Sequence, residues 1–436
     1  MSLRAPLYLI ASPVNLSPPA VGRIIITLGT DVAIIGAGPY GLSIAAFLRK
    51  AGVAFRIFGD PMSNWRTRMP KGMHLKSDGF ASSLFDPGRH FRLEKYCAQN
   101  GIPYKDLGLP VSLENFSAYG MAFQKQLVPT LDTRMVVRLE RVAEGFRITL
   151  DDGEIVYSRR AIVATGISYY EFLPKELQDL PKALCSHSAD NRDLTGYQDK
   201  DVVVLGRGAS ATDVAALLVD QRARVQIISR EPIEFQLPPR DRPVSKWRRI
   251  REFNFGLGPS FRSAVYTLFP SLFRLLPVRL RHRIVRRHLG PAAVYFIRDK
   301  LEANVPMLSG YALRDAKAVD KRVALRFVHR DSGELNLTVD HVIAGTGYVV
   351  DLKRLPFIDD ALRAEIRQEA TSPKLSGSFE SSVPGLYFVG VASAGTFGPL
   401  TRFAHGAGFT ARKISAHLRR TRTKEIVVEE FSGAKG

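Results

Sequence analysis

Two glycine-rich turns in this chain have the spacing of a phosphate-binding loop. In such a turn the first glycine makes a sharp bend, the second lets the backbone approach a pyrophosphate, and the third lets the following helix pack on the preceding strand. The positive end of that helix then faces the phosphates. Each copy follows a short apolar run and opens an amphipathic one, so each predicts a strand, turn and helix that bind a dinucleotide. The positions are Gly36, Gly38 and Gly41 in the first copy and Gly206, Gly208 and Ala211 in the second.

The residue at the end of the next strand indicates which dinucleotide each turn binds, because a carboxylate there would bind ribose hydroxyls. After the first turn this position is Gly59 with Asp60 beside it, and Asp60 is the candidate ribose ligand. After the second turn it is Ser229, followed by Arg230. An acid would repel a 2′-phosphate, whereas an arginine would hold it by charge-assisted bonds. The second site is therefore expected to take NADPH, unless Arg230 is only a solvated surface residue.

The two turns belong to an internal duplication. Each copy continues to an alternating β segment with a tight turn, Asp152-Gly153 or Ser332-Gly333, and then to an apolar strand that ends in Thr-Gly. The Thr-Gly pairs are Thr165-Gly166 and Thr346-Gly347. A late strand, GLYFVG, and a helical run from Thr401 to Leu418 have too little chain after them to form another domain. The predicted fold is α/β, with two Rossmann-like dinucleotide-binding domains, the second inserted into a discontinuous first.

Composition excludes several other classes of protein. Hydrophobic residues make up 45% of the 436 residues, which excludes a disordered chain. The two cysteines, Cys97 and Cys185, exclude a disulfide scaffold, a CxxC pair and a cysteine-rich zinc site, and no metal is expected. Apolar runs are too short for a membrane span, and four prolines interrupt the apolar part of residues 1–30. A soluble, cytoplasmic protein is the expectation.

Fifteen Lys and Arg against three acids fall between Arg240 and Lys300, so this stretch carries +12 of the net charge of +20. Within it, leucines and phenylalanines alternate with arginines at helix-like spacing. The segment is interpreted as a lid over the substrate cavity, with reversible contact to an anionic membrane as a second possibility. A nucleic-acid patch is the weakest interpretation, because no binding-fold signature accompanies the charge. No nucleic-acid partner is expected.

The order of these motifs, with ATG at Ala164 to Gly166, GTGY at Gly345 to Tyr348 and the late GLYFVG strand, resembles the class B flavin monooxygenases. This group holds flavin-containing, N-hydroxylating and Baeyer–Villiger monooxygenases, and the resemblance covers about Asp31 to Leu418. It implies FAD at the first turn and NADPH at the second. The WRTRMPKGMHLK loop and the segment after the last strand would adjoin the flavin. The cofactor-binding residues implied are Gly36, Gly38, Pro39, Tyr40, Gly41, Trp65, Met73, Thr165, Gly166, Gly390, Gly398 and Pro399 for FAD, and Gly206, Gly208, Ser210 and Ala211 for NADPH.

Two departures from the family pattern limit this resemblance. The monooxygenase fingerprint before the second turn is reduced to His187-Ser188, with Pro181 and Ala183 where Phe and Gly are expected. This weakens a Baeyer–Villiger activity and leaves His187 as a weak catalytic candidate that would position the nicotinamide or serve only the structure. In addition, Val391 replaces the usual acid after Gly390.

The resemblance implies an NADPH-dependent FAD monooxygenase that transfers one atom of O2 to a small organic substrate through a C4a-hydroperoxyflavin. Two alternatives stay open: a reductase that passes electrons to a quinone or protein carrier, and a non-catalytic redox sensor that holds both cofactors. The predicted organisation is an extension (1–30), the FAD domain (31–195 and 341–420), the NADPH domain (196–340) with the basic insertion (240–300), and a tail (421–436).

Overall fold

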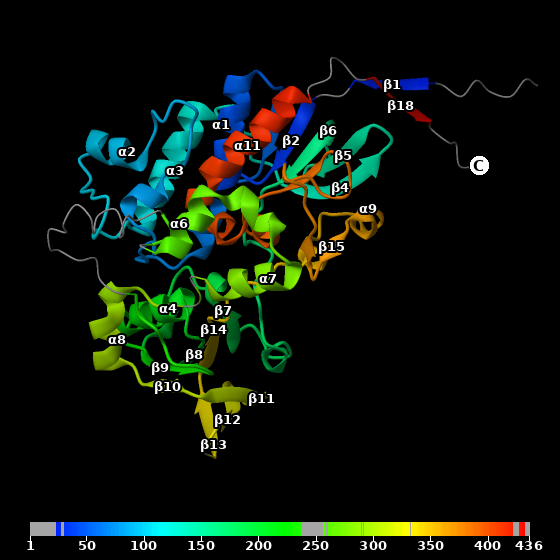
Figure 1. The fold of residues 1–436 in the computed structure, drawn as a ribbon. Coiled ribbons are helices and arrows are strands. Elements are labelled where there is room, and N and C mark those ends of the chain that lie inside the picture. The colour runs from blue at the N-terminus through cyan, green and yellow to red at the C-terminus, as the bar shows by residue number, and fades with distance from the viewer. Residues whose placement is uncertain are drawn as a thin grey trace, which may run out of the picture.

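The computed structural model describes residues 30–236, 256–258, 260–288, 290, 292–331 and 333–421, together with the backbone of 23–27 and 427–431. Two α/β lobes lie one above the other, and α6 and α7 cross the region between them (Figure 1). This arrangement confirms the predicted fold class.

The first lobe is built on a six-stranded sheet. Five of its strands follow the order β3-β2-β6-β5-β4, and the sixth, β17, pairs with the C-terminal part of β6. Strands β2, β3 and β17 run parallel to β6, whereas β5 is antiparallel to it and forms the hairpin predicted at Asp152-Gly153. Strand β2 is buried almost throughout, as expected for a parallel strand covered on both faces. The strands are β2 (Thr30–Ile35), β3 (Phe55–Phe58), β4 (Val136–Val142), β5 (Gly145–Leu150), β6 (Ile155–Val163) and β17 (Leu386–Phe388).

Helices cover this sheet. Helix α1 enters directly from the first glycine turn and ends at Gly52, whose φ of 67° is left-handed and suits glycine. Helix α11 packs against α1, so the C-terminal part of the chain returns to the first lobe. It begins six residues later than predicted because the residues before it form short 3₁₀ turns. The helices are α1 (Pro39–Ala51), α2 (Leu93–Gln99), α3 (Leu113–Leu127), α9 (Asp360–Glu365), α10 (Ala394–Phe397) and α11 (Ala407–Arg420).

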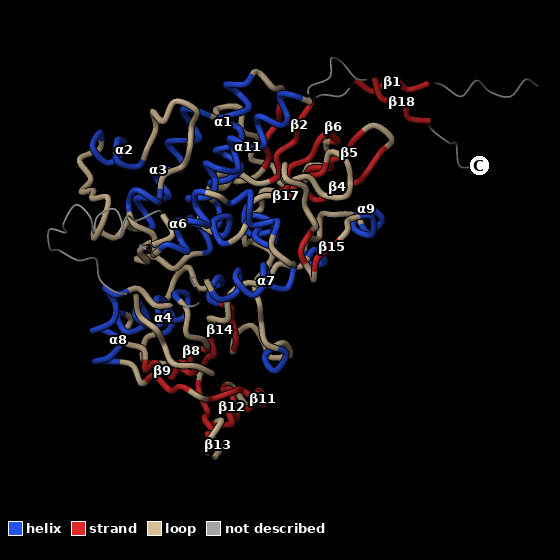
Figure 2. Tube along the Cα trace, viewed as in Figure 1, coloured by secondary structure: helices blue, strands red, loops and turns tan. Residues whose placement is uncertain are grey.

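The second lobe repeats the plan with a parallel sheet in the order β10-β9-β8-β14-β7 and a separate three-stranded antiparallel sheet (Figure 2). Helix α4 follows the second glycine turn as α1 follows the first. The predicted turn residue Ser332 lies outside the described residues. The elements are β7 (Cys185–His187), β8 (Asp201–Leu205), α4 (Ala209–Asp220), β9 (Arg224–Ser229), α8 (Arg298–Asn304), β10 (Met307–Ser309), β11 (Tyr311–Val319), β12 (Arg322–His329), β13 (Glu334–Val339) and β14 (His341–Ala344).

Strand pairing differs from the expected domain boundaries at two places, near residues 185–187 and 341–344. Strands β7 and β14 fall in the segments assigned to the first domain, yet both pair within the second sheet. Pairing between strands far apart in sequence decides this membership, and local pattern does not reveal it. The expected extension and tail also meet, because β1 (Arg23–Thr27) pairs antiparallel with β18 (Val427–Phe431).

The described part of the basic insertion forms α6 (Phe261–Leu268), a 3₁₀ turn (Pro270–Leu275) and α7 (Val278–Arg287). It rests on the first lobe near α10 and near the small pair β15 (Gln368–Glu369) and β16 (Ser372–Pro373). Residues 240–255 of the insertion lie outside the described residues. Among the described helices, none is both long and apolar enough to cross a membrane.

Candidate dinucleotide and substrate site

A cavity of about 640 Å³ extends from the first glycine turn to the start of α4. Its walls come from both lobes and from the basic insertion, which contributes Gly256, Leu257 and Gly258. Eleven of the predicted site residues line it: Gly36, Gly38, Pro39, Tyr40, Asp60, Trp65, Met73, Thr165, Gly166, Ser210 and Gly390.

The first turn has the geometry that its glycines predict. Gly36 has φ of +114°, and a Cβ there would lie 2.6 Å from the carbonyl oxygen of Ala164. A Cβ on Gly41 would lie 1.9 Å from the carbonyl oxygen of Gly36, so only glycine lets α1 approach this closely. Gly38 is different, because a Cβ on it would meet nothing within 4 Å. The open space at Gly38, beside the N-terminus of α1, fits a dinucleotide pyrophosphate.

Tyr40 ties this turn to the C-terminal part of the chain. Its hydroxyl donates to the carbonyl oxygens of Thr401, at 2.9 Å, and Phe403, at 2.8 Å. Burial raises the pKa of this hydroxyl far above its usual range, so it stays a donor. These bonds also engage two carbonyls just before α11, which accounts for its late start.

The loop after β3 forms one wall of the cavity. Asp60 lies at its beginning and pairs with Arg66 at 2.7 Å. Trp65 packs its ring edge-on against Phe116, with centroids 4.8 Å apart, so it serves the core and the cavity together. Met73 also lines the cavity.

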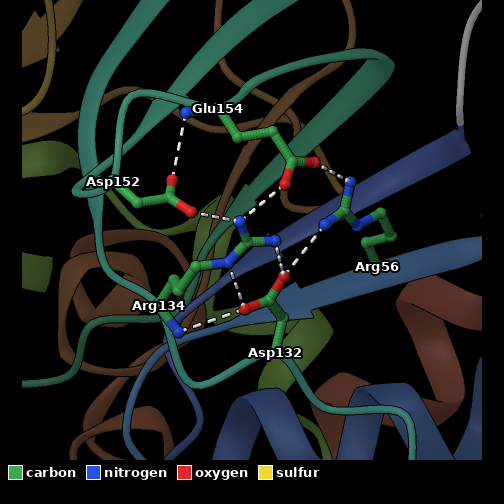
Figure 3. Close-up of polar contacts among 5 residues, drawn as sticks. All are labelled: Arg56, Asp132, Arg134, Asp152 and Glu154. Atoms are coloured by element: carbon green, nitrogen blue, oxygen red, sulfur yellow. Dashed lines mark hydrogen bonds and ion pairs between the residues drawn. The ribbon is translucent and has the colours of Figure 1, made fainter.

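An ion-pair network holds the end of β3 in place (Figure 3). Arg134 donates to both oxygens of Asp132, at 2.9 and 2.7 Å, and also contacts Asp152 and Glu154 in the β5–β6 turn. Arg56 of β3 bridges Asp132 and Glu154, at 2.9 Å each. The guanidinium of Arg134 holds the pKa of Asp132 well below its usual range. Because the backbone carbonyl of Asp132 also accepts the backbone N–H of Gly59, the network fixes the backbone that presents Asp60.

The second turn repeats the first. Gly206 has φ of +136°, and a Cβ there would lie 2.4 Å from the carbonyl oxygen of Gly345. Gly208 caps α4, and Ala211 is fully buried against the GTG segment. Of this turn, Ser210 faces the cavity.

The end of β9 gathers arginines. The hydroxyl of Ser229 donates to the carbonyl of Glu231, and the carbonyl of Arg230 accepts from Arg330 at 2.9 Å. Arg207, between the glycines of the second turn, reaches Glu234 at 3.3 Å. Neither Arg207 nor Arg330 was among the predicted residues. Arg207 lies within the glycine motif, so the sequence could have identified it. No sequence pattern indicates that Arg330 lies beside β9.

Two opposite charges that the sequence did not single out as site residues line the cavity where the lobes meet. Lys76 ends the WRTRMPKGMHLK loop and donates to the carbonyl of Ala292 at 2.8 Å. Asp213 lies on α4, one turn after Ser210. Burial raises the pKa of Asp213 to about 7, with the charge of Lys76 acting against this, and burial lowers the pKa of Lys76. Both groups lie in poorly hydrated surroundings, which is common at functional sites.

Arg402 and His405 complete the wall near the insertion. Arg402 donates to the carbonyls of Val285 and His288, at 2.7 and 3.2 Å, and so holds the end of α7. Burial lowers the pKa of His405 to about 4, which leaves its ring neutral near pH 7. Its buried Nδ1 has no hydrogen-bond partner among the described residues.

Nine predicted site residues are not among those that line the cavity: Gly41, His187, Gly206, Gly208, Ala211, Ser229, Arg230, Gly398 and Pro399. His187 uses both ring nitrogens locally, with Nδ1 accepting from Ala189 at 3.2 Å and Nε2 donating to the carbonyl of Gly347 at 3.1 Å. This arrangement gives His187 a structural role and leaves no nitrogen for a nicotinamide. Gly398 faces the ring of Phe273, and Pro399 is buried beside it, so this segment supports the insertion instead of lining the cavity.

Two lobes, each with a strand, glycine turn and helix, meet at one cavity, and this is the fold of two-dinucleotide-domain flavoproteins. A family model described as pyridine nucleotide-disulphide oxidoreductase matches residues 33–248. An ornithine N-hydroxylase of Kutzneria sp. 744, solved with reduced FAD, NADP⁺ and L-ornithine, has the same fold. Its TM-score is 0.72 at 16% identity, covering 90% of this chain and 99% of that one. The predicted resemblance is confirmed: the chain has the fold of the FAD- and NADPH-dependent oxidoreductases that include flavin monooxygenases.

Curated relatives are more varied. The chain is 24% identical over 380 residues to a ferredoxin–NADP reductase of Thermus thermophilus, covering 83% of this chain and 84% of the relative. It is 28% identical over 196 residues to an uncharacterized CzcO-like oxidoreductase of Geobacillus kaustophilus, covering 44% of this chain and 52% of that protein. The chain thus spans about half the length of some curated relatives that it matches.

Proposed function

We propose that this protein is an NADPH-dependent FAD monooxygenase that acts on a small organic substrate. The observation that carries the proposal is the cavity shared by the first glycine turn, the start of α4 and the insertion, with no cysteine among its described lining residues. In the balanced reaction, substrate, O2, NADPH and H⁺ give hydroxylated substrate, water and NADP⁺. Bound FAD would supply the redox chemistry between NADPH and O2.

The first lobe would hold FAD. The N-terminus of α1, which begins directly after Gly38, would present N–H groups to a pyrophosphate, and α1 carries no acid in its first turn to oppose it. Asp60 stands at the ribose end, steadied by Arg66 and by the network around Asp132. Trp65 and Met73 would then cover the flavin from the loop side.

The second lobe would hold NADPH. The N-terminus of α4 faces the cavity through Ser210. At the end of β9 the guanidinium of Arg330 donates to the backbone carbonyl of Arg230 and pairs with Glu231. A 2′-phosphate would ion-pair with the side chains of Arg230 and Arg330 by charge-assisted bonds. Lys76 and Asp213 lie where the two lobes' ligands would meet.

A dry cavity favours oxygen transfer over loss of peroxide to water. The low pKa of His405 and the raised pKa of Asp213 both follow from burial of these side chains. The insertion supports this through Leu257, which is 3% exposed and covers one side of the cavity. The lid interpretation of the insertion is retained on this basis.

A second candidate is a reductase that passes electrons to a protein or quinone carrier. It is favoured by the similarity to a ferredoxin–NADP reductase over most of both chains. A dithiol acceptor within this chain is not available to either function, because Cys97 and Cys185 are buried in different lobes and neither lines the cavity.

Rapid mixing of the NADPH-reduced, FAD-loaded protein with O2 distinguishes the two. A monooxygenase should show a transient spectrum that is neither reduced nor oxidised flavin, and NADP⁺ should slow its decay. Ferredoxin and quinone should be poor acceptors in the same preparation. Direct return to the oxidised spectrum, together with fast ferredoxin or quinone reduction, would favour the reductase.

A further inference from the structure

The described part of the basic insertion exposes an unusual amount of apolar surface. Of sixteen large hydrophobic side chains exposed among the described residues, eight lie between Phe261 and Leu280. Phe261 is 82% exposed and Leu275 71%. Single exposed hydrophobic residues are ordinary on protein surfaces, but a concentration of this size marks an interaction surface.

The spacing places these side chains in two stripes. Phe261, Val265 and Leu268 recur at the three- and four-residue intervals of one α-helical face on α6. Phe269, Leu272 and Leu275 recur at intervals of three, which is one face of the 3₁₀ turn that follows. Each element therefore turns its other face to the protein and keeps these apolar side chains in water.

Arginines surround the stripes. Exposed guanidinium groups stand on α6, on the 3₁₀ turn and along α7, and no acid occurs anywhere from residue 260 to 288. Helix α11 adds Lys413, whose Nζ donates to Ser271 of the turn at 2.8 Å. The exposed arginines are Arg262, Arg274, Arg279, Arg283, Arg286 and Arg287.

The face is presented by a packed platform. Tyr266 of α6 contacts the rings of Phe273 and His288, with centroids 5.7 and 4.8 Å apart, and so joins α6 to the turn and to the end of α7. Arg281 of α7 is buried, pairs with Glu369 at 2.9 Å and donates to the carbonyl of Gly395 at 2.6 Å. The platform is thus fixed to the first lobe, and its exposed arginines are separate from the one that anchors it.

We propose that the face formed by α6, the 3₁₀ turn and α7 docks this protein on an anionic lipid bilayer. Apolar stripes interleaved with arginines, without acids, match the acyl boundary and anionic headgroups of such a surface. The residues that line the cavity, at Gly256 to Gly258, directly precede α6. Docking would therefore bring the cavity's roof to the membrane surface, whatever reaction the cavity catalyses.

Flotation of the FAD-loaded full chain with vesicles tests this. The protein should float with phosphatidylglycerol-containing vesicles, float much less with pure phosphatidylcholine, and dissociate as salt rises from about 0.05 to about 0.5 M. The variant Phe261→Ser/Leu272→Ser/Leu275→Ser should bind more than about tenfold more weakly to anionic vesicles. Arg274→Glu/Arg279→Glu/Arg283→Glu should lose the preference for anionic lipid.

Matched control variants distinguish docking through this face from nonspecific hydrophobic binding and from an effect of net charge. Val137→Ser/Ile155→Ser/Val319→Ser removes three exposed apolar side chains elsewhere, and Lys95→Glu/Lys125→Glu/Lys321→Glu makes the same change of charge on other elements. Both should float like the wild type, and retained FAD absorbance verifies that each variant is folded. Failure of the wild type to float with anionic vesicles would overturn the proposal. So would equal losses in the controls, or a serine variant that floats normally but dissociates from a dimer, which would make the face a contact between copies.

Discussion

Gly36 and Ala164 meet so closely that a Cβ on residue 36 would lie 2.6 Å from the Ala164 carbonyl oxygen. This contact joins the first glycine turn to the segment directly after β6, which also contains Thr165 and Gly166. Two positions apart, Gly38 has open space where a Cβ would stand. The structure therefore separates a glycine required for the backbone from a glycine that leaves room for a ligand.

Gly38→Val should leave the melting temperature of the cofactor-free protein nearly unchanged and abolish FAD retention, because the side chain would occupy the pyrophosphate space. Gly196→Val is a matched control, since a Cβ there also meets nothing within 4 Å. Gly36→Ala should instead destabilise the cofactor-free protein by about 1–3 kcal/mol or more, through the clash and its φ of +114°. Absorbance and thermal melting measure both effects, and full FAD content in Gly38→Val would contradict the assignment.

Arg230→Ala and Arg330→Ala should each raise the KM for NADPH by roughly tenfold or more, since a charge-assisted bond contributes about 1.5–3 kcal/mol. The KM for NADH should hardly change, because NADH lacks the 2′-phosphate. Arg314→Ala, an exposed arginine on β11, is the control. Steady-state kinetics with both nucleotides measure these KM values. Equal use of NADH and NADPH by the wild type would contradict a 2′-phosphate site at Arg230 and Arg330.

Asp132→Asn should destabilise the protein by about 2 kcal/mol at pH 7, because it loses charge-assisted bonds to Arg134 and Arg56. The folded pKa of Asp132 is depressed, so its contribution is present above the unfolded value near ~3.9 and is lost as pH falls below it. The gap in melting temperature between variant and wild type should therefore narrow at about pH 3. Asp151→Asn, in the same turn but outside the network, should show neither effect; a gap independent of pH would refute this account.

Asp213→Asn should stabilise the cofactor-free protein more at pH 8 than at pH 5. The folded pKa of Asp213 is raised to about 7, so its favourable contribution is complete below the unfolded value and disappears as pH rises through 7. The amide keeps the shape and removes the buried charge. Melting temperatures at the two pH values test this, with Asp220→Asn at the other end of α4 as control. A larger gain at pH 5 would show that the carboxyl is ionised throughout.

Sequence alone located the two nucleotide turns, the first hairpin and the late return strand. These features are local: Gly36, Gly38 and Gly41 serve one strand–turn–helix unit, and the chemistry of a turn depends on a few neighbouring residues. Duplication made the interpretation firmer, because the same unit recurs at Gly206 in the same order. Residues such as Tyr40 and Trp65 followed from the resemblance of their motifs.

Tertiary structure alone decided what meets across the molecule. Strands β7 and β14 belong to the second sheet because of pairing between distant segments. The side chain of Arg330 reaches the backbone carbonyl of Arg230, and Lys76 shares a cavity with Asp213, through contacts that no local pattern encodes. His187 fits a motif in the sequence, but its hydrogen bonds to Ala189 and Gly347 make it structural. The local sequence determines the conformation of each turn and helix. Contacts between distant side chains depend instead on how whole elements pack, and burial at those contacts shifts the pKa values of the side chains.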